Sequence, residues 1–268
     1  MPSILWNGQL LNSDTPLVRP DSLTVRYGIG VFETMRCDKG TLLFVEDHVE
    51  RLTRALHALS IPVEPVYNHT DLTEQARNLM HHHTLESGRI RISVLSNGDN
   101  PPDYLMSCAP LPAPESQPLH IDFSSHFGVM ASPVSFFKNI NYQHYLLAAD
   151  EAKQRGLDDV ILLNQHQRIC ETSISNIFCR TGSIILTPAI EEGCVAGIFR
   201  KNVLKVLRDH RYEVHETQIT TQQLLNAEEI FLTNVIRGIR AVGTLGAEIK
   251  DNTLALQLKQ HFSAFYPE

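Results

Sequence analysis

The sequence predicts two domains that combine α-helices with antiparallel and mixed β-sheet. Strand-like segments alternate with helical ones along all 268 residues, which is typical of α/β and α+β folds. The segment C-A-P-L-P-A-P-E-S-Q-P at residues 108–118 is rich in proline and lacks a core pattern, as a linker does. We therefore expect a small N-terminal α/β domain at residues 1–114 and a larger C-terminal domain at residues 115–268.

Composition narrows the class of protein. Hydrophobic residues make up 43% of the chain and charged residues 20%, as in an ordinary globular protein. The net charge of −7 argues against nucleic acid or an anionic membrane as the main partner. The N-terminus shows no basic stretch followed by an apolar run, and the five cysteines form no C-x-x-C pair. We expect a cytoplasmic protein with reduced thiols, no membrane span and no metal site.

The first elements are predicted from turn residues and alternation. Residues 4–11 are expected to form a hairpin around an Asn-Gly turn. Residues 31–37 are expected to form a strand, and Gly28 and Gly30 before it allow close backbone approach. Because these glycines precede the strand, a dinucleotide-binding loop is not indicated.

Helical periodicity follows. A helix from Glu46 to about Pro62 carries Arg51 among its apolar residues, and a second helix is expected near residues 71–83. Three adjacent histidines at its end cannot all face one metal, so we interpret them as a solvated helix end. The other expected elements are a strand at 42–45, a strand at 89–95 and a loop, S-N-G-D-N-P-P-D, at 96–103.

A lysine next to apolar residues is the first notable feature of the C-terminal half. Lys138 follows two phenylalanines, and a helix ending at Gly156 comes soon after it. Strands are then expected at 160–163 and from Glu171 through S-I-S-N-I-F. Further along the chain we expect a strand at 183–186, a helix through 203–207, a strand at 212–217, a short helix at 224–225 and a last strand at 230–233.

Lys138 and Glu171 are the residues that most suggest chemistry. An ammonium group among aromatic side chains is costly, so the pKa of Lys138 should fall and its amine should become nucleophilic. A carboxylate followed by small hydroxyl residues could hold a cationic ring and a phosphate. The alternative is a lysine that reaches solvent and a solvated glutamate, but the order of the whole stretch favours a functional role.

At this point the order of motifs resembles the class IV (fold-type IV) aminotransferase family of pyridoxal-phosphate enzymes. The motifs are Y-G-I-G-V-F-E-T-M-R, D-H-V-E-R-L, K-N-I-N-Y, D-D-V-I-L-L-N, E-T-S-I-S-N-I-F, G-I-F-R and F-L-T-N. The resemblance covers nearly the whole chain. Within the family, T-N-V-I-R-G-I-R is more similar to the aminodeoxychorismate lyases than to the transaminases.

The resemblance implies a role for individual residues. Lys138 matches the lysine that binds pyridoxal 5′-phosphate as a Schiff base and moves protons, and Glu171 matches the acid that pairs with the pyridine nitrogen. Arg51 matches the phosphate-binding arginine, and Tyr142 matches a tyrosine near the phenolic oxygen of the cofactor. Two further pairs match segments whose backbone N–H groups meet the phosphate: Ile198 with Phe199, and Asn234 with Val235.

The implied activity is a lyase that releases pyruvate and 4-aminobenzoate from 4-amino-4-deoxychorismate in folate biosynthesis. Thr34 matches a threonine that assists protonation of the leaving group, although β-propensity alone could explain a threonine there. Arg91 and Arg237 are the candidates for the substrate carboxylates. The resemblance also implies a homodimer with its active site near the subunit interface.

Two other functions stay open. A branched-chain or D-amino acid transaminase would use the same Lys138, Glu171 and Arg51, and a non-catalytic binding protein would not need all three. Transaminases usually carry hydroxyl residues where this chain has Phe199 and Val235, and the D-amino acid enzymes carry an R-x-H carboxylate trap that is missing here. These departures favour the lyase.

Overall fold

The computed structural model describes residues 3–15, 17–63, 69–114 and 117–266. The chain divides into two compact units, which we describe separately. The first comprises Met1–Pro112 with Phe137–Asn141, and the second comprises Ala113–Phe136 with Tyr142–Glu268. The sequence places residues 137–141 in the second domain, whereas the structure groups them with the first unit.

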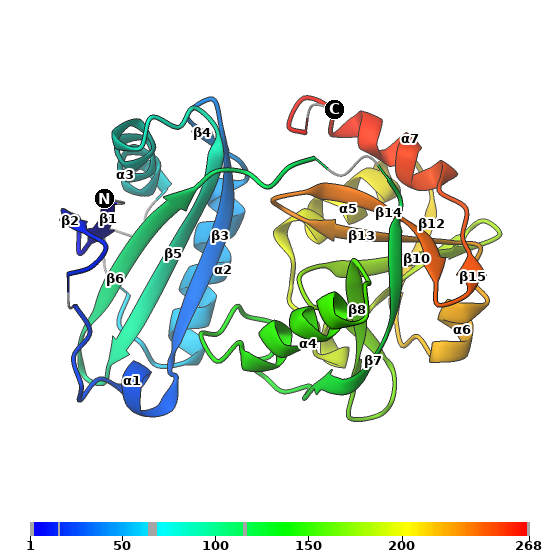
Figure 1. The fold of residues 1–268 in the computed structure, drawn as a ribbon, viewed down its shortest axis with the longest axis horizontal. Coiled ribbons are helices and arrows are strands. Elements are labelled where there is room, and N and C mark those ends of the chain that lie inside the picture. The colour runs from blue at the N-terminus through cyan, green and yellow to red at the C-terminus, as the bar shows by residue number, and fades with distance from the viewer. Residues whose placement is uncertain (1–2, 16, 64–68, 115–116, 267–268) are drawn as a thin grey trace. The chain divides into compact units, whose positions relative to one another are not determined.

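The first unit is built on a six-stranded antiparallel sheet with the strand order β2-β1-β6-β5-β3-β4 (Figure 1). Helix α2 packs against β3, and helix α3 packs against β1 and β6. The strands are β1 (Ser3–Trp6), β2 (Gln9–Asn12), β3 (Gly30–Asp38), β4 (Thr41–Leu42), β5 (Gly88–Asn97) and β6 (Asn100–Ala109). The helices are α1 (Leu23–Tyr27), α2 (Val45–Ala58) and α3 (His69–His82).

Alternation along β3 decides which side chains meet the helices. Met35 lies on the face toward α2 and is buried, as are Leu52 and Leu56 of that helix. Because side chains of a strand alternate between its two faces, Phe32 and Thr34 lie on the opposite face. Thr34, one of the residues predicted for chemistry, therefore lies on the face opposite α2.

Two expectations for the first unit are wrong. The predicted strand at 42–45 is short, because Phe44 takes a left-handed conformation (φ 55°) and α2 starts at Val45. The expected loop at 96–103 is a tight hairpin whose residues from Asn100 onward belong to β6. Pro101 and Pro102 fit in this strand because the pairing of β5 with β6 is irregular there, so no regular ladder hydrogen bond is lost.

The second unit is built on a nine-stranded mixed sheet with the main order β12-β11-β10-β13-β14-β7-β8-β9, and β15 pairs with β14 (Figure 1). Its core includes Ile121, Ile161, Ile230, Leu232 and Val242. The strands are β7 (Leu119–Val129), β8 (Asp159–Asn164), β9 (Ile169–Thr172), β10 (Asn176–Thr181), β11 (Ile184–Pro188), β12 (Glu213–Thr217), β13 (Glu229–Asn234), β14 (Gly238–Leu245) and β15 (Glu248–Ile249). The helices are α4 (Gln143–Gln154), α5 (Ile198–Asp209), α6 (Thr221–Leu225) and α7 (Thr253–His261).

The second unit also corrects the sequence analysis at two places. The strand expected from Glu171 through Phe178 is divided into β9 and β10 by residues 173–175. The strand at 230–233 is not the last one, because Asn234 and Gly238 (φ 71°) bound a tight turn that returns the chain into β14. Strand β15 and helix α7 come after it.

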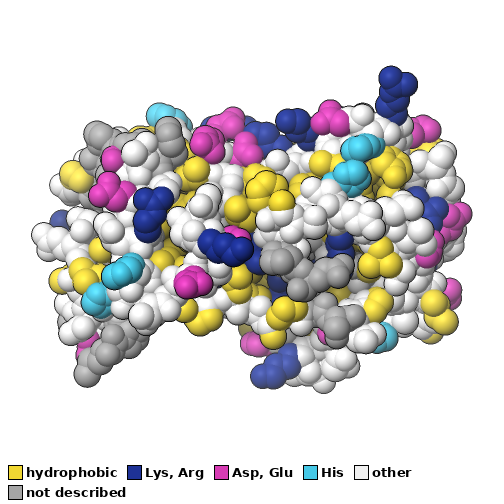
Figure 2. Space-filling view, turned by 90° about the horizontal axis from the view of Figure 1, so that it is seen from above, with side chains coloured by type: hydrophobic (Ala, Val, Ile, Leu, Met, Phe, Trp, Pro, Cys, Tyr) yellow, Lys and Arg dark blue, Asp and Glu magenta, His cyan; other side chains and the backbone are white. Residues whose placement is uncertain are grey.

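Acidic and basic side chains are interspersed on the face that Figure 2 shows, and neither sign gathers in one patch. This fits a chain of moderate negative net charge. No helix among the described residues is long and apolar enough to cross a membrane. Within the same residues, histidine, cysteine and acidic side chains form no group that could hold a metal ion.

Candidate active site

Lys138 is held against the edge of β3 by backbone hydrogen bonds. The Phe32 N–H donates to the Lys138 carbonyl (2.8 Å), and the Ile140 N–H donates to the Gly30 carbonyl (3.0 Å). A Cβ on Gly30 would lie 2.5 Å from Ile140 Cδ1 and 2.7 Å from a backbone carbonyl oxygen of β5. Only glycine fits so close a contact, which explains the second glycine of the Y-G-I-G motif.

The ring of Phe32, on the face of β3 opposite α2, lies close to two basic side chains. The Lys138 Nζ lies 5.0 Å from the ring centroid, and the Arg91 guanidinium carbon lies 3.7 Å from it. Both distances are in the range of cation–π attraction. Thr34 is the direct cross-strand partner of Arg91 in the pairing of β3 with β5. The structure therefore brings Lys138 and Arg91 to one aromatic side chain, and it pairs Thr34 with Arg91 in the sheet.

Arg51 lies on the other face of β3, in a buried ion pair that the sequence analysis did not anticipate. Its Nε donates to Glu33 Oε1 (2.7 Å) and its Nη2 donates to Glu33 Oε2 (2.6 Å). His48 Nδ1 also donates to Glu33 Oε2 (2.7 Å). Burial raises the pKa of Glu33, but Arg51 and His48 outweigh it and lower this pKa to about 2. The role of Arg51 toward a phosphate stays a prediction.

The partners of Arg51 had a weak signal in the sequence. Glu33 is a charged residue at a position of β3 whose neighbours two residues away, Val31 and Met35, are apolar. His48 precedes Arg51 by three residues and so lies on the same helix face. These two patterns together predict a charged group buried between strand and helix, but they do not say which residue bonds to which.

Glu171 is buried in the second unit, with its side chain held by three donors. The Tyr145 hydroxyl (2.5 Å) and the Val195 N–H (3.1 Å) donate to Oε1, and Asn176 Nδ2 donates more weakly to Oε2 (3.4 Å). Burial and the Glu171 carboxylate raise the pKa of Tyr145 well above its usual value. The ring of Tyr145 stacks on Tyr142, with 4.2 Å between centroids. Tyr145 thus connects two predicted residues that are distant in sequence.

The donors of Glu171 also set the start of α5. Asn176 Nδ2 donates to the Val195 carbonyl (2.8 Å), so one amide contacts both Glu171 and the segment before the helix. A Cβ on Gly197, the N-cap of α5, would lie 2.0 Å from Asn176 Oδ1, so any other residue there would force the Asn176 side chain out of its position. The carboxylate and the helix N-terminus are therefore held at a fixed separation by residues 195–197.

Phe199 and Ile198 do not offer polar side chains at the start of α5. Both are buried, and the ring of Phe199 packs edge-on against Phe262 and Tyr266, with centroid distances of 4.8 and 5.0 Å. In the part of the chain that the structure describes, no side chain caps this helix. The first turn therefore presents backbone N–H groups and the positive end of the helix dipole, an arrangement that suits an anion.

The turn between β13 and β14 is organised by Asn234. Its Oδ1 accepts from the Ile236 N–H (3.1 Å) and the Arg237 N–H (2.8 Å), and its Nδ2 donates to Ser175 Oγ (3.0 Å). The Tyr266 hydroxyl donates to the Val235 carbonyl (2.7 Å). Arg237 is partly buried at the end of this turn.

A second polar cluster holds the segment between β9 and β10, and the sequence analysis missed it. Asp159 accepts from the Ser173 hydroxyl (2.6 Å) and the Thr172 hydroxyl (2.7 Å), and Arg240 donates to Ser175 Oγ (3.0 Å). Burial raises the pKa of Asp159. These residues keep the hydroxyls after Glu171 engaged with protein atoms, so we assign them a structural role.

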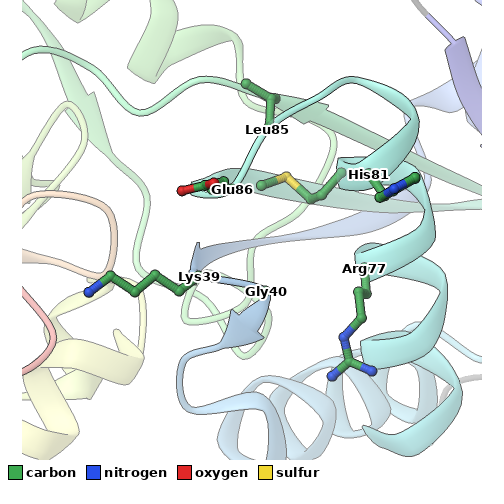
Figure 3. A pocket seen from close by; sticks show the side chains of 7 residues that line it. Lys39, Gly40, Arg77, His81, Leu85 and Glu86 are labelled. Atoms are coloured by element: carbon green, nitrogen blue, oxygen red, sulfur yellow. The ribbon is translucent and has the colours of Figure 1, made fainter.

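A cavity of about 290 Å³ on the first unit lies among Lys39, Gly40, Arg77, Met80, His81, Leu85 and Glu86 (Figure 3). No residue predicted for the active site lines it. The charged ends of Lys39 and Arg77 point away from each other in Figure 3 and so do not converge on a common ligand. We assign it no function.

The chain is similar to known proteins along most of its length. The family model described as amino-transferase class IV matches residues 30–245. The chain is similar to an aminodeoxychorismate lyase of Bacillus subtilis, with 27% identity over 95% of this chain and 92% of that protein. It is also similar to a mitochondrial branched-chain amino acid aminotransferase of Humulus lupulus, with 28% identity over 84% of this chain and 63% of that protein.

A branched-chain aminotransferase structure from Thermoproteus uzoniensis shares the fold, with a TM-score of 0.87, 22% identity and coverage of 97% of this chain and 93% of that chain. The family match spans most of the sequence and includes Lys138, Glu171, Arg51 and the start of α5. This chain belongs to the class IV aminotransferase family.

Proposed function

We propose that this chain is a 4-amino-4-deoxychorismate lyase that releases pyruvate and 4-aminobenzoate. The observation that carries the proposal is the arrangement around Phe32, where an amine, a hydroxyl and a guanidinium share one face of the sheet. A lyase acting on a cyclic diacid needs a base, a proton donor for the leaving group and a cation for a carboxylate. The similarity to the B. subtilis lyase over nearly the whole chain also supports it.

The cofactor of this family is pyridoxal 5′-phosphate, and the residues of this chain fit it. Glu171 is a buried carboxylate that suits a protonated pyridine nitrogen, and residues 195–197 connect it to the start of α5, whose N–H groups suit a phosphate. Lys138 is the amine that would bind the aldehyde carbon, and Arg51 is the cation expected at the phosphate. When bound, the cofactor supplies an aldehyde for the substrate amine and a ring that accepts electrons.

Each polar group around Phe32 then has a role in the reaction. The Lys138 amine takes the proton from the ring carbon that bears the substrate nitrogen. The carbon–oxygen bond to the enolpyruvyl group breaks, the ring becomes aromatic, and the Thr34 hydroxyl delivers a proton to the methylene carbon of the leaving enol. Arg91, and Arg237 from the β13–β14 turn, bind carboxylates. The two products together contain the atoms of the substrate, so no other reactant is needed.

A transaminase is the alternative, and the similarity to the H. lupulus enzyme supports it. Lys138 and Glu171 serve both reactions, so they do not distinguish them. Phe199 and Val235 do favour the lyase, because the ring of Phe199 is turned into the core and neither side chain can donate to a phosphate.

The decisive experiment offers the purified holoenzyme both kinds of substrate. We expect pyruvate and 4-aminobenzoate in equal amounts from aminodeoxychorismate. We also expect little conversion of the cofactor to its amine form by D-alanine or by L-branched-chain amino acids. Rapid conversion by an amino acid, without pyruvate release from aminodeoxychorismate, would establish the transaminase instead.

Matched variants separate the assigned roles. Arg91→Ala should raise the KM for aminodeoxychorismate while the protein stays yellow. Arg89 is an exposed arginine two residues away on the same strand, and Arg89→Ala should leave this KM unchanged. Arg237→Ala should also weaken substrate use without loss of cofactor. Thr34→Ala should lower kcat by about 10²-fold, the lower end for a lost proton donor, and Thr34→Ser should restore most of it.

A further inference from the structure

The side chain of Tyr266 joins two segments of the second unit that are far apart in the sequence. Its hydroxyl donates to the Val235 carbonyl (2.7 Å) in the turn between β13 and β14. Its ring packs edge-on against Phe199 at the start of α5, with 5.0 Å between centroids. One side chain therefore touches both segments whose backbone N–H groups are expected to meet the cofactor phosphate.

The ring of Tyr266 also limits which residue type can stand at position 238, the end of the turn. Gly238 has φ of 71°, and a Cβ there would lie 3.1 Å from two atoms of the Tyr266 ring. Left-handed backbone and close ring contact together require glycine. Phe262, the C-cap of α7, also packs edge-on against Phe199, with 4.8 Å between ring centroids. The turn, the start of α5 and the end of α7 are thus in contact through aromatic rings.

This contact has a consequence for phosphate binding, because Phe199 and Val235 lack hydroxyl groups. A serine or threonine hydroxyl can rotate toward a phosphate oxygen even when its backbone is slightly displaced. A backbone N–H cannot rotate independently, so its direction depends on the position of the whole segment. Backbone donors from two separate segments can bind one phosphate well only if the spacing between the segments is held constant.

We propose that Tyr266 is a positioning residue for the cofactor phosphate, which acts by holding the β13–β14 turn and the start of α5 at the required spacing. It bonds to the carbonyl of Val235 and packs on the ring of Phe199, the two residues that stand in place of hydroxyl donors. The proposal depends on the cofactor of the family and not on the choice between lyase and transaminase.

The test compares two ligands that differ only in the phosphate group. Cofactor-free protein is titrated with pyridoxal 5′-phosphate and with pyridoxal. The dissociation constant of pyridoxal divided by that of pyridoxal 5′-phosphate measures the contribution of the phosphate to binding. Tyr266→Phe keeps the ring and loses the hydroxyl, so this ratio should fall about three- to tenfold, the range for one lost hydrogen bond. Tyr266→Leu also removes the ring contacts and should lower the ratio further. The dissociation constant of pyridoxal should stay within about twofold.

Tyr212→Phe is the matched control, since it removes a phenolic hydroxyl from the same unit outside both segments. Thermal denaturation of each cofactor-free variant checks that it is folded, and if Tyr266→Leu is not, Tyr266→Phe alone decides. If the binding of both ligands weakens by the same factor, Tyr266 has a general structural role. If neither dissociation constant changes, Tyr266 has no role in binding the cofactor. Either result overturns the proposal. No turnover is measured, so failure of the lyase assignment would leave this result intact.

Discussion

Replacing Glu33 with glutamine removes the carboxylate that neutralises Arg51 inside the first unit. Glu33 is almost fully buried and accepts two hydrogen bonds from Arg51 and one from His48. Removing one partner of a buried ion pair leaves an uncompensated charge, which costs roughly 3–5 kcal/mol. We expect Glu33→Gln to lower the free energy of unfolding by this amount at pH 7. Glu46→Gln, at an exposed position on the helix that carries Arg51, should change it by less than about 1 kcal/mol.

The pH dependence gives a second measure of the same pair. The pKa of Glu33 falls from an ordinary 4.5 to about 2 in the folded protein. Because the folded pKa is the lower one, the stabilisation is complete above pH 4.5 and disappears as the pH falls toward 2. The difference corresponds to about 3 kcal/mol. Burial also lowers the pKa of His48. Protonation of His48 therefore removes further stability as the pH falls, beginning near pH 6.5.

The assay uses the single tryptophan of the chain. Trp6 lies on β1 in the first unit, so its fluorescence follows unfolding of the unit that contains Glu33. Urea unfolding is measured from pH 7 to pH 2.5 for the wild type, Glu33→Gln and Glu46→Gln. The wild type should approach the stability of Glu33→Gln as the pH falls below 4.5. Parallel curves for these two proteins, or a loss below 1 kcal/mol at pH 7, would refute the ion-pair argument.

The other predictions concern the active site and the assembly. Borohydride treatment of the holoenzyme should attach the cofactor to the peptide that contains Lys138, and labelling of a different lysine would exclude Lys138 as the Schiff-base residue. Glu171→Gln should bind the cofactor but lose about 10²–10⁴-fold in turnover. Tyr145→Phe, which removes one of the hydrogen-bond donors to Glu171, should lower turnover about tenfold or more. A near-normal rate in either variant would remove that residue from the mechanism. Sedimentation should find a homodimer, the commonest closed assembly, and a fully active monomer at low concentration would contradict it.

Local sequence patterns predicted most helices and strands. They were least reliable at proline and turn residues, where the pairing of strands in space decides the backbone conformation. The prolines at 101 and 102 indicated a loop, yet both lie in β6 where its pairing with β5 is irregular. The turn after the strand at 230–233 contains polar and glycine residues, and such a turn is a common end of a strand. Whether it ends the sheet or reverses the chain depends on which segment can pair with that strand in space.

The residues predicted for chemistry were found through motif order, whereas their partners were not found. Lys138 and Glu171 are recognisable from their neighbours in the sequence. Tyr145 donates to Glu171 from 26 positions away, and Tyr266 donates to Val235 from 31 positions away. Nothing within a helical turn or a strand repeat relates residues so far apart.

The sequence by itself determined the family, the cofactor and most of the helices and strands, because these depend on motifs and periodicities that extend over only a few residues. The tertiary structure alone decided that Glu33 neutralises Arg51, that Phe32 gathers Lys138 and Arg91, and that Tyr266 contacts both predicted phosphate segments. The physical reason is that a buried polar group must find its partner at hydrogen-bond distance. Which group comes that close is set by strand register and by the packing of helices on sheets.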